Sequence, residues 1–200
     1  MQAPKLANFA LLLAAGVMLT ACAVGTDFVR PPADAIELGK TTYKQVEERF
    51  GKPKDETRVQ HNKDLLRAVS YSYANDFDSP KIPNTMAMRQ LIFLFSGDVV
   101  VMESFNSSFA ADSTDFDQHK VGDIIKGKTR CSEVVQLLGR PSGKAIFPVV
   151  DNQGESAMSY EFSYVKRPLL KFKTYQKGLK VICDSAGVVS DVSYTEAGDP

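Results

Sequence analysis

The sequence predicts an α+β protein of two tandem units, each consisting of a helical segment followed by a three-stranded antiparallel sheet. Three observations support this fold class. A motif occurs twice, at residues 39–53 and 127–141. Alternating apolar and polar residues follow each copy, and two apolar runs separated by a turn come after that. Self-similarity of this kind is the signature of a repeated supersecondary unit.

The two copies of the motif coincide at Gly, Lys, Thr, Val, Gly and Pro when they are offset by 88 residues (127 − 39). Each copy predicts one short helix with an apolar face. Thr41 or Thr42, and Thr129 in the second copy, are suited to accept a hydrogen bond from a free amide at the helix start, and Gln45 stands three residues after Thr42 as in a capping box. Gly51 and Gly139 are suited to close the helix, and the proline two residues later prevents its continuation.

Residues 1–21 are predicted to be a signal peptide. Lys5 precedes an apolar run, Phe9 to Leu19, that is shorter than the roughly 20 apolar residues of a membrane-spanning helix. The run ends in Leu19-Thr20-Ala21-Cys22, which resembles the lipobox of bacterial lipoproteins. That resemblance implies cleavage before Cys22 and attachment of diacylglycerol and palmitate to it. The alternative is an ordinary secretory signal that happens to end at a cysteine.

The rest of the chain divides by composition. Residues 22–35, with Pro31-Pro32 and no apolar period, predict an extended tether. The expected order is then a first unit at 36–105, a polar linker at 106–122 and a second unit at 123–195.

The strands of each unit follow from apolar patterning. Val69–Tyr73 and Met158–Phe162 alternate as half-buried strands do. The remaining strands are expected as paired apolar runs, Leu91–Phe95 with Val99–Met102 in the first unit, and Leu179–Cys183 with Val188 onward in the second.

The repeated pattern of Gly and Thr, a short run with Val, and Leu/Phe-Gly-x-Pro resembles the SmpA/OmlA (BamE-like) family of bacterial outer-membrane lipoproteins. Two tandem copies are also similar to the related beta-lactamase inhibitory protein-like fold. The first resemblance implies a non-catalytic accessory factor in outer-membrane protein assembly or envelope integrity that binds protein and phospholipid. A lipid anchor in the outer membrane, facing the periplasm, is also expected, because Ala23 rather than Asp follows the cysteine, which by analogy with enterobacterial lipoprotein sorting favours that membrane. The implied envelope partner is the β-barrel assembly machinery. The second resemblance implies an alternative, a tandem binding module that inhibits or regulates a periplasmic or extracellular enzyme.

Two cysteines remain once Cys22 is assigned to lipid. Thiols of an exported protein usually pair. Subtracting 88 maps Cys131 onto Tyr43 and Cys183 onto Phe95. If those two aromatic residues touch in the first unit, the cysteines touch in the second. A Cys131–Cys183 disulfide is therefore predicted, with two separately buried thiols as the alternative.

Several chemistries are excluded or disfavoured. Residues 122–129 match the phosphate-loop pattern but lack the preceding strand that such a loop requires, so no nucleotide is expected. The aspartates at 112, 115 and 117 lack calcium-loop spacing, and His61 and His119 have no partner at metal-ligand spacing. No catalytic residues, enzyme activity, metal or other cofactor are predicted. The formal net charge of zero argues against nucleic-acid binding.

One basic and aromatic cluster is a candidate site for an acidic partner or anionic lipid. Its residues are Lys166, Arg167, Lys171, Phe172, Lys173 and Tyr175. The alternative is a solvated edge whose lysines prevent aggregation. An exposed row formed by Tyr71, Tyr73, Tyr160 and Phe162 would favour the inhibitor function, whereas burial of that row would indicate a simple core.

Overall fold

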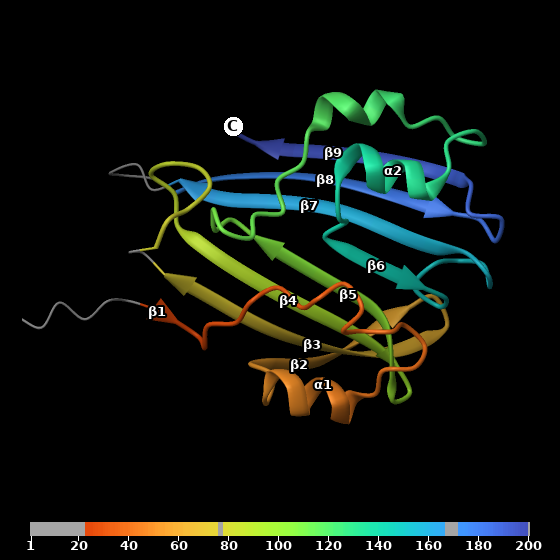
Figure 1. The fold of residues 1–200 in the computed structure, drawn as a ribbon. Helices are drawn as coiled ribbons and strands as arrows, with labels where there is room; N and C mark the ends of the chain where they lie inside the picture. The colour runs from red at the N-terminus through yellow and green to blue at the C-terminus, as the bar shows by residue number, and fades with distance from the viewer. Residues whose placement is uncertain (1–22, 76–77, 167–171, 200) are drawn as a thin grey trace, which may run out of the picture.

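In a computed structural model that describes residues 23–75, 78–166 and 172–199, the strands form one antiparallel sheet (Figure 1). The order across the sheet is β1-β3-β4-β5-β6-β7-β8-β9, and β2 pairs with β3 along the same edge as β1, opposite β4. The first half contains β1 (Ala23–Val24), α1 (Tyr43–Phe50), β2 (Asp55–His61), β3 (Asp64–Asn75), β4 (Ala87–Ser96) and β5 (Val99–Ser107). The second half contains the 3-10 helix η1 (Gln118–Asp123), α2 (Cys131–Leu138), β6 (Gly143–Ile146), β7 (Ser156–Lys166), β8 (Lys173–Cys183) and β9 (Val189–Gly198).

The predicted fold class of two units, each with its own three-stranded sheet, is wrong. β5 and β6 pair through Met102↔Ala145, Glu103↔Lys144 and Ser104↔Gly143, which makes the strands of both halves one sheet. Each helix is followed by four strands, because β2 and β6 precede the strands expected from apolar patterning. β2 escapes that patterning since its side chains are almost all exposed. Joining the halves covers two strand edges that would otherwise be open to aggregation.

The helix ends form as the motif predicts except at the start of α2, where the N-cap residue is Arg130 and not Thr129, whose Oγ1 accepts from the Ile125 amide instead. The Thr42 amide donates to the side-chain oxygen of Gln45 at 2.8 Å, and the Gln45 amide donates to Thr42 Oγ1 at 3.4 Å, which completes a capping box. At α2 the Arg130 amide donates to Glu133 at 2.7 Å. Gly139 ends α2 with φ +82°, a backbone conformation that side chains with a Cβ rarely adopt.

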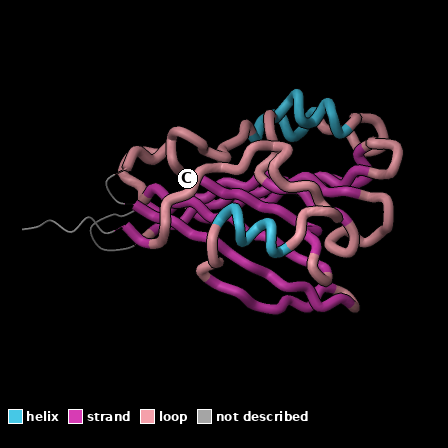
Figure 2. The backbone as a smooth tube through the Cα atoms, turned by 60° about the horizontal axis from the view of Figure 1, so that its bottom comes forward, coloured by secondary structure: helices cyan, strands magenta, loops and turns pink. Residues whose placement is uncertain are grey.

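Both helices lie on the same face of the sheet, as the register shows. Cross-strand partners point to the same side. One row of partners runs through Val69, Phe93, Glu103, Lys144, Met158 and Val181. Val46 of α1 packs with the first end of this row and Val134 of α2 with the other. We call this side the helix face and the opposite side the open face; Figure 2 shows the helices against the layer of strands.

Two hydrophobic cores lie under the two helices. Tyr71, Leu91, Phe93 and Phe105 are buried in the first core, and Tyr160, Leu179 and Val181 in the second. The aromatic row named above belongs to the helix face, where none of Tyr71, Tyr73, Tyr160 and Phe162 is more than 9% exposed. These aromatic side chains therefore serve the interior and are not exposed for docking.

The segment 106–122 packs against the helix face. Phe109 and Phe116 are buried, and two buried cations hold the segment. Arg89 of β4 pairs with Asp112 at 2.8 Å, and Lys177 of β8 pairs with Asp115 at 2.7 Å. These two cations are 88 residues apart (177 − 89), the offset of the sequence motif.

Residues 25–38, which we call the strap, also lie on the helix face. Just before the strap, Ala23 of β1 pairs with Asn75. Phe28 then contacts Phe105 edge to face, with ring centroids 6.3 Å apart. Ile36 is buried in the first core. The segment predicted as an extended tether is thus bound to the domain over most of its length.

Candidate functional site

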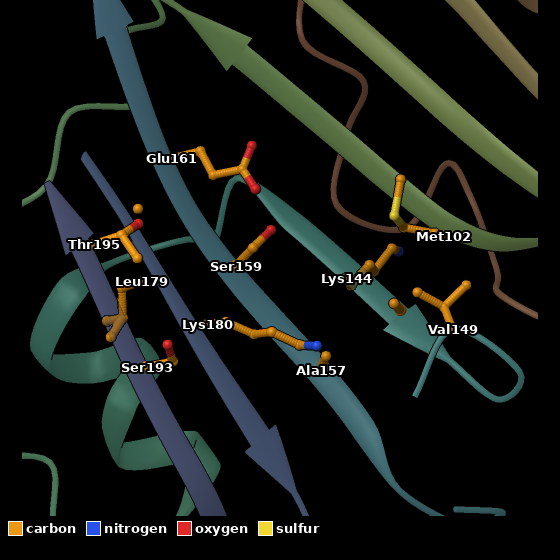
Figure 3. A pocket seen from close by; sticks show the side chains of 12 residues that line it. Met102, Lys144, Val149, Ala157, Ser159, Glu161, Leu179, Lys180, Ser193 and Thr195 are labelled. Atoms are coloured by element: carbon orange, nitrogen blue, oxygen red, sulfur yellow. The ribbon is translucent and has the colours of Figure 1, made fainter. Parts of the chain in front are cut away.

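The open face carries a hollow of about 320 Å³ where the two halves of the sheet meet. Its walls come from β5, β6, β7, β8 and β9 and from the loop after β6 (Figure 3). Apolar side chains at one end include Met102, Val149 and Ala157, and polar side chains at the other include Ser159, Glu161, Ser193 and Thr195. Such a mixture of apolar surface and a few convergent polar groups is typical of binding sites.

Glu161 is the acidic residue of this hollow. Its carboxylate faces Ser104, whose hydroxyl is hydrogen-bonded to it across the seam between β5 and β7. The surrounding protein partly desolvates the carboxylate and thereby raises the pKa of Glu161, an effect the Ser104 hydrogen bond opposes. The side chain nevertheless stays solvent-accessible. Lys144 and Lys180 also line the hollow (Figure 3). A partner group that donates a hydrogen bond to the carboxylate would offset the cost of its desolvation.

The seam itself is polar because β6 is only four residues long. Ahead of Gly143, β5 and β7 have no strand between them, and Ser142 links them instead. Its carbonyl accepts from the Phe105 amide at 2.8 Å, and its hydroxyl accepts from the Glu161 amide at 2.8 Å. Farther along, Asn106 Nδ2 donates to Ser163 Oγ at 3.2 Å. The hollow is therefore bordered by a junction in which hydrogen bonds connect β5 to β7.

Only some side chains of the basic and aromatic cluster are exposed on the surface. Lys166 lies 5.7 Å from the ring centroid of Tyr164, Phe172 is 74% exposed, and Lys173 pairs with Asp199 at 2.9 Å. Tyr175, in contrast, is 6% exposed, and its hydroxyl donates to Glu196 at 2.8 Å. Arg167, Lys171 and the lipid-attachment candidate Cys22 lie outside the described residues.

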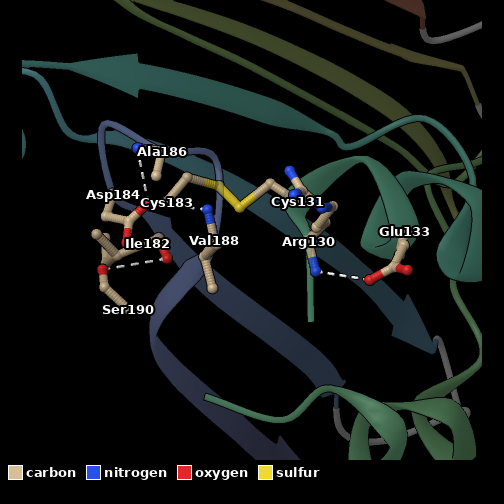
Figure 4. Close-up of a disulfide and its surroundings, with 9 residues drawn as sticks. All are labelled: Arg130, Cys131, Glu133, Ile182, Cys183, Asp184, Ala186, Val188 and Ser190. Atoms are coloured by element: carbon tan, nitrogen blue, oxygen red, sulfur yellow. Dashed lines mark hydrogen bonds between the residues drawn. A yellow bond between two sulfur atoms is a disulfide. The ribbon is translucent and has the colours of Figure 1, made fainter. Parts of the chain in front are cut away.

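Cys131 and Cys183 are joined by a disulfide with an S–S distance of 2.04 Å (Figure 4). It connects the first residue of α2 to the last residue of β8. At the corresponding positions of the first half, the rings of Tyr43 and Phe95 lie in contact, with centroids 5.5 Å apart. The same junction of helix and strand is thus made by aromatic packing in one half and by a covalent bond in the other.

Other chemistries find little support in the described part of the chain. Within residues 23–75, 78–166 and 172–199, no three His, Cys, Asp or Glu side chains gather as a metal site would require. No helix in those ranges is both long enough and apolar enough to cross a bilayer. The phosphate-loop pattern begins inside η1 and is not preceded directly by a strand.

Sequence patterning did not identify the hollow. The signal was present in β7, where Ser159, Glu161 and Ser163 alternate with buried aromatic residues. That alternation predicts a polar face for the strand. It cannot show that the polar face lies beside β5, because the pairing of the halves depends on contacts distant in sequence.

Comparisons with known proteins give one distant likeness. No protein-family model matches the chain, and no curated protein matches it. Its structure is similar to a protein from Streptococcus mutans described as a "putative beta-lactamase inhibitor protein". The two are 14% identical, with a TM-score of 0.42 over 78% of this chain and 82% of that chain. A likeness this distant carries no argument about function.

Proposed function

We propose that this protein is a non-catalytic lipoprotein of the bacterial envelope that binds a protein partner through the open face of its sheet. The observation that carries this proposal is the hollow around Glu161, which lies on the face that neither helix covers. A partner side chain entering it would find apolar contacts and hydrogen-bond acceptors together.

Export from the cytoplasm is supported by the disulfide, since such bonds persist in oxidising compartments. In this proposal Cys22 is acylated and anchors the protein to the outer membrane, facing the periplasm. Because Ala23 already pairs with Asn75, the anchor would leave the domain at the end of β3. The sheet would then be held close to the membrane, with its open face available to a neighbouring protein.

The partner that we propose is the machinery that assembles outer-membrane β-barrels, with this chain as an accessory factor. The second candidate is an envelope enzyme that the chain inhibits or regulates. An exposed row of aromatic anchors would favour this second candidate, but the row formed by Tyr71, Tyr73, Tyr160 and Phe162 is buried. The hollow on the open face is compatible with either partner.

Site-specific photo-crosslinking in the native envelope would test the proposal. A photoreactive residue replaces Ser193, which is exposed on the open face, and a matched one replaces Lys44, which is exposed on α1. We expect crosslinks from position 193 to a component of the assembly machinery. Crosslinks from position 193 to a soluble envelope enzyme would select the second candidate. Equal crosslinking from both positions, or none from 193, would exclude the open face as the docking surface.

A further inference from the structure

A second hollow, of about 380 Å³, lies on the helix face between the strap and α2. Three cationic side chains and one carboxylate line it, namely Arg30 of the strap, Arg140 after α2, Lys144 of β6 and Glu103 of β5. Their formal charges add up to +2. The hollow lies on the side of the sheet opposite the Glu161 site, and Lys144 of the short strand β6 borders both. An anion site here does not depend on the function proposed above.

Part of this cluster holds the strap in place. Arg30 Nη2 donates to the Pro141 carbonyl, and Arg140 Nη2 donates to the Pro31 carbonyl at 2.7 Å. Lys144 Nζ donates to the Ile36 carbonyl at 2.6 Å. These bonds fix the positions of all three cations relative to one another, so the charged lining of the hollow is preorganised.

The strap does not use all the donors of the cluster. A guanidinium group has five N–H donors in a planar fork. Among the residues that the structure describes, Arg30 Nε is buried without a hydrogen-bond partner. The strap contacts use one donor of Arg30 and one of Arg140, so further N–H groups of both side chains remain for a ligand.

The charges of the cluster are also unbalanced. Burial, and secondly the neighbouring Arg140, lower the pKa of Arg30 to about 10, while Glu103 and Asp112 oppose this shift. Glu103 is 5% exposed and lies 3.4 Å from Lys144. It is the only carboxylate among the described residues that line the hollow. A second carboxylate, Asp112, acts on Arg30 from outside the hollow but is itself paired with Arg89. The lining therefore keeps a surplus of positive charge, which a bound anion would neutralise.

We propose that this hollow binds a phosphate group carried as inorganic phosphate or as a phosphate monoester. A phosphate monoester has a charge of about −1.5 to −2 at neutral pH, which matches the surplus of the cluster. A carboxylate would leave one positive charge uncompensated. Two arginines supply the forked donors that phosphate oxygens accept in pairs, and a lysine adds a point charge.

The test uses the full chain in detergent micelles and isothermal titration calorimetry. One arm titrates inorganic phosphate, and the other adds short-chain phosphatidic acid, which carries a phosphate monoester headgroup, against phosphatidylcholine as its control. We expect binding of free phosphate, of phosphatidic acid, or of both, and the responding arm identifies the source. Arg140→Gln should weaken that binding by about tenfold or more, because it removes a charged donor. Arg58→Gln, the same change at an exposed position of β2, should leave it unchanged.

Arg140→Gln also removes the hydrogen bond to the Pro31 carbonyl and could displace the strap, so a second variant is needed that leaves this bond in place. Val135 lines the hollow from α2 and is 38% exposed, so Val135→Glu adds a negative charge without removing a strap contact. It should also weaken phosphate binding by about tenfold. No binding in either arm overturns the proposal. So does phosphate binding that both Arg140→Gln and Val135→Glu leave equal to that of Arg58→Gln.

Discussion

The buried cations Arg89 and Lys177 show how much of this fold depends on single polar residues. Each projects from a central strand onto the helix face and pairs with an aspartate of the segment 106–122. Lys177 also donates to Gln118 at 2.6 Å and lies 4.7 Å from the ring centroid of Phe116. A polar segment without regular apolar patterning is thereby fixed over the second core.

Lys177→Met should lower the free energy of unfolding by about 3 kcal/mol, because removing one partner of a buried ion pair leaves the other without compensation. Lys180→Met is the matched control. Lys180 is exposed on the open face of the same strand, so its replacement should change stability by no more than about 0.5 kcal/mol. Urea unfolding of both variants measures the difference. Equal effects would mean that the contacts of Lys177 contribute nothing beyond those of a surface lysine.

Glu161 should make stability depend on pH. Burial raises the pKa of Glu161 above its ordinary value of 4.5, so the folded protein takes up this proton at a higher pH than the unfolded chain. Between those two values, the free energy of unfolding should fall as pH rises. Glu103, whose pKa burial also raises, acts in the same direction.

Glu161→Gln should therefore flatten the pH dependence of stability just above pH 4.5 without abolishing it, since Glu103 remains. Urea unfolding in steps of half a pH unit measures the slope. Glu48→Gln, at an exposed position of α1, should keep the wild-type slope. An unchanged slope in Glu161→Gln would show that the hollow does not desolvate this carboxylate.

At the scale of elements, α2 is fastened to the sheet by the disulfide, while α1 relies on the contact of Tyr43 with Phe95. The bond closes a loop with a sequence separation of 52. On the chain-entropy model, a loop of this size contributes about 4 kcal/mol to stability.

The double variant Cys131→Ala/Cys183→Ala should lose about 4 kcal/mol of unfolding free energy. Reductant should destabilise the wild-type protein similarly and leave the double variant unaffected. Thermal unfolding with and without reductant checks both expectations. A wild-type protein insensitive to reductant under unfolding conditions would contradict the assignment.

Gly143, the first residue of β6, allows β5, β6 and β7 to approach one another closely where the two halves of the sheet join. A Cβ built on it would lie 2.9 Å from the Glu103 carbonyl oxygen and 2.4 Å from Ser159 Oγ. Gly143→Ala should therefore destabilise the protein by about 1–3 kcal/mol through overpacking at the seam. At Gly178, in β8, the nearest atom to a Cβ is Thr195 Oγ1 at 3.4 Å, so Gly178→Ala should have a smaller effect or none. Denaturant unfolding ranks the two variants, and the reverse order would be inconsistent with the close approach of β5, β6 and β7.

At the scale of the whole molecule, one sheet should give one cooperative unit. Pairing of β5 with β6, the strap, and the segment 106–122 all tie the first core to the second. A substitution that destabilises one core should therefore also lower the stability of the other.

Leu91→Ala, in the first core, should cost about 2–5 kcal/mol. Hydrogen exchange followed by mass spectrometry should show loss of protection by a similar free energy in β3, β4, β7 and β8. Leu179→Ala, in the second core, should give the same pattern. Loss confined to the half that carries the substitution would mean that the halves unfold independently.

The sequence by itself determined the local features of this protein. Thr42, Gln45 and Gly51 bound the first helix because caps act within a few residues of the chain. Alternating residues placed β3 and β7, since a half-buried strand exposes every second side chain. The offset of 88 residues also mapped Cys131 and Cys183 onto Tyr43 and Phe95, which predicted that the two cysteines meet. In the structure they form a disulfide.

Only the tertiary structure decided how these pieces combine. The pairing of Glu103 with Lys144 joins residues far apart in sequence, and no local pattern encodes which strand edge meets which. β2 carries almost no apolar signal because it is a solvent-exposed edge strand. The first hollow exists because β5 to β9 meet around the seam, and the second because the strap and α2 converge over it on the helix face. Contacts of this kind depend on long-range packing, which composition and periodicity do not specify.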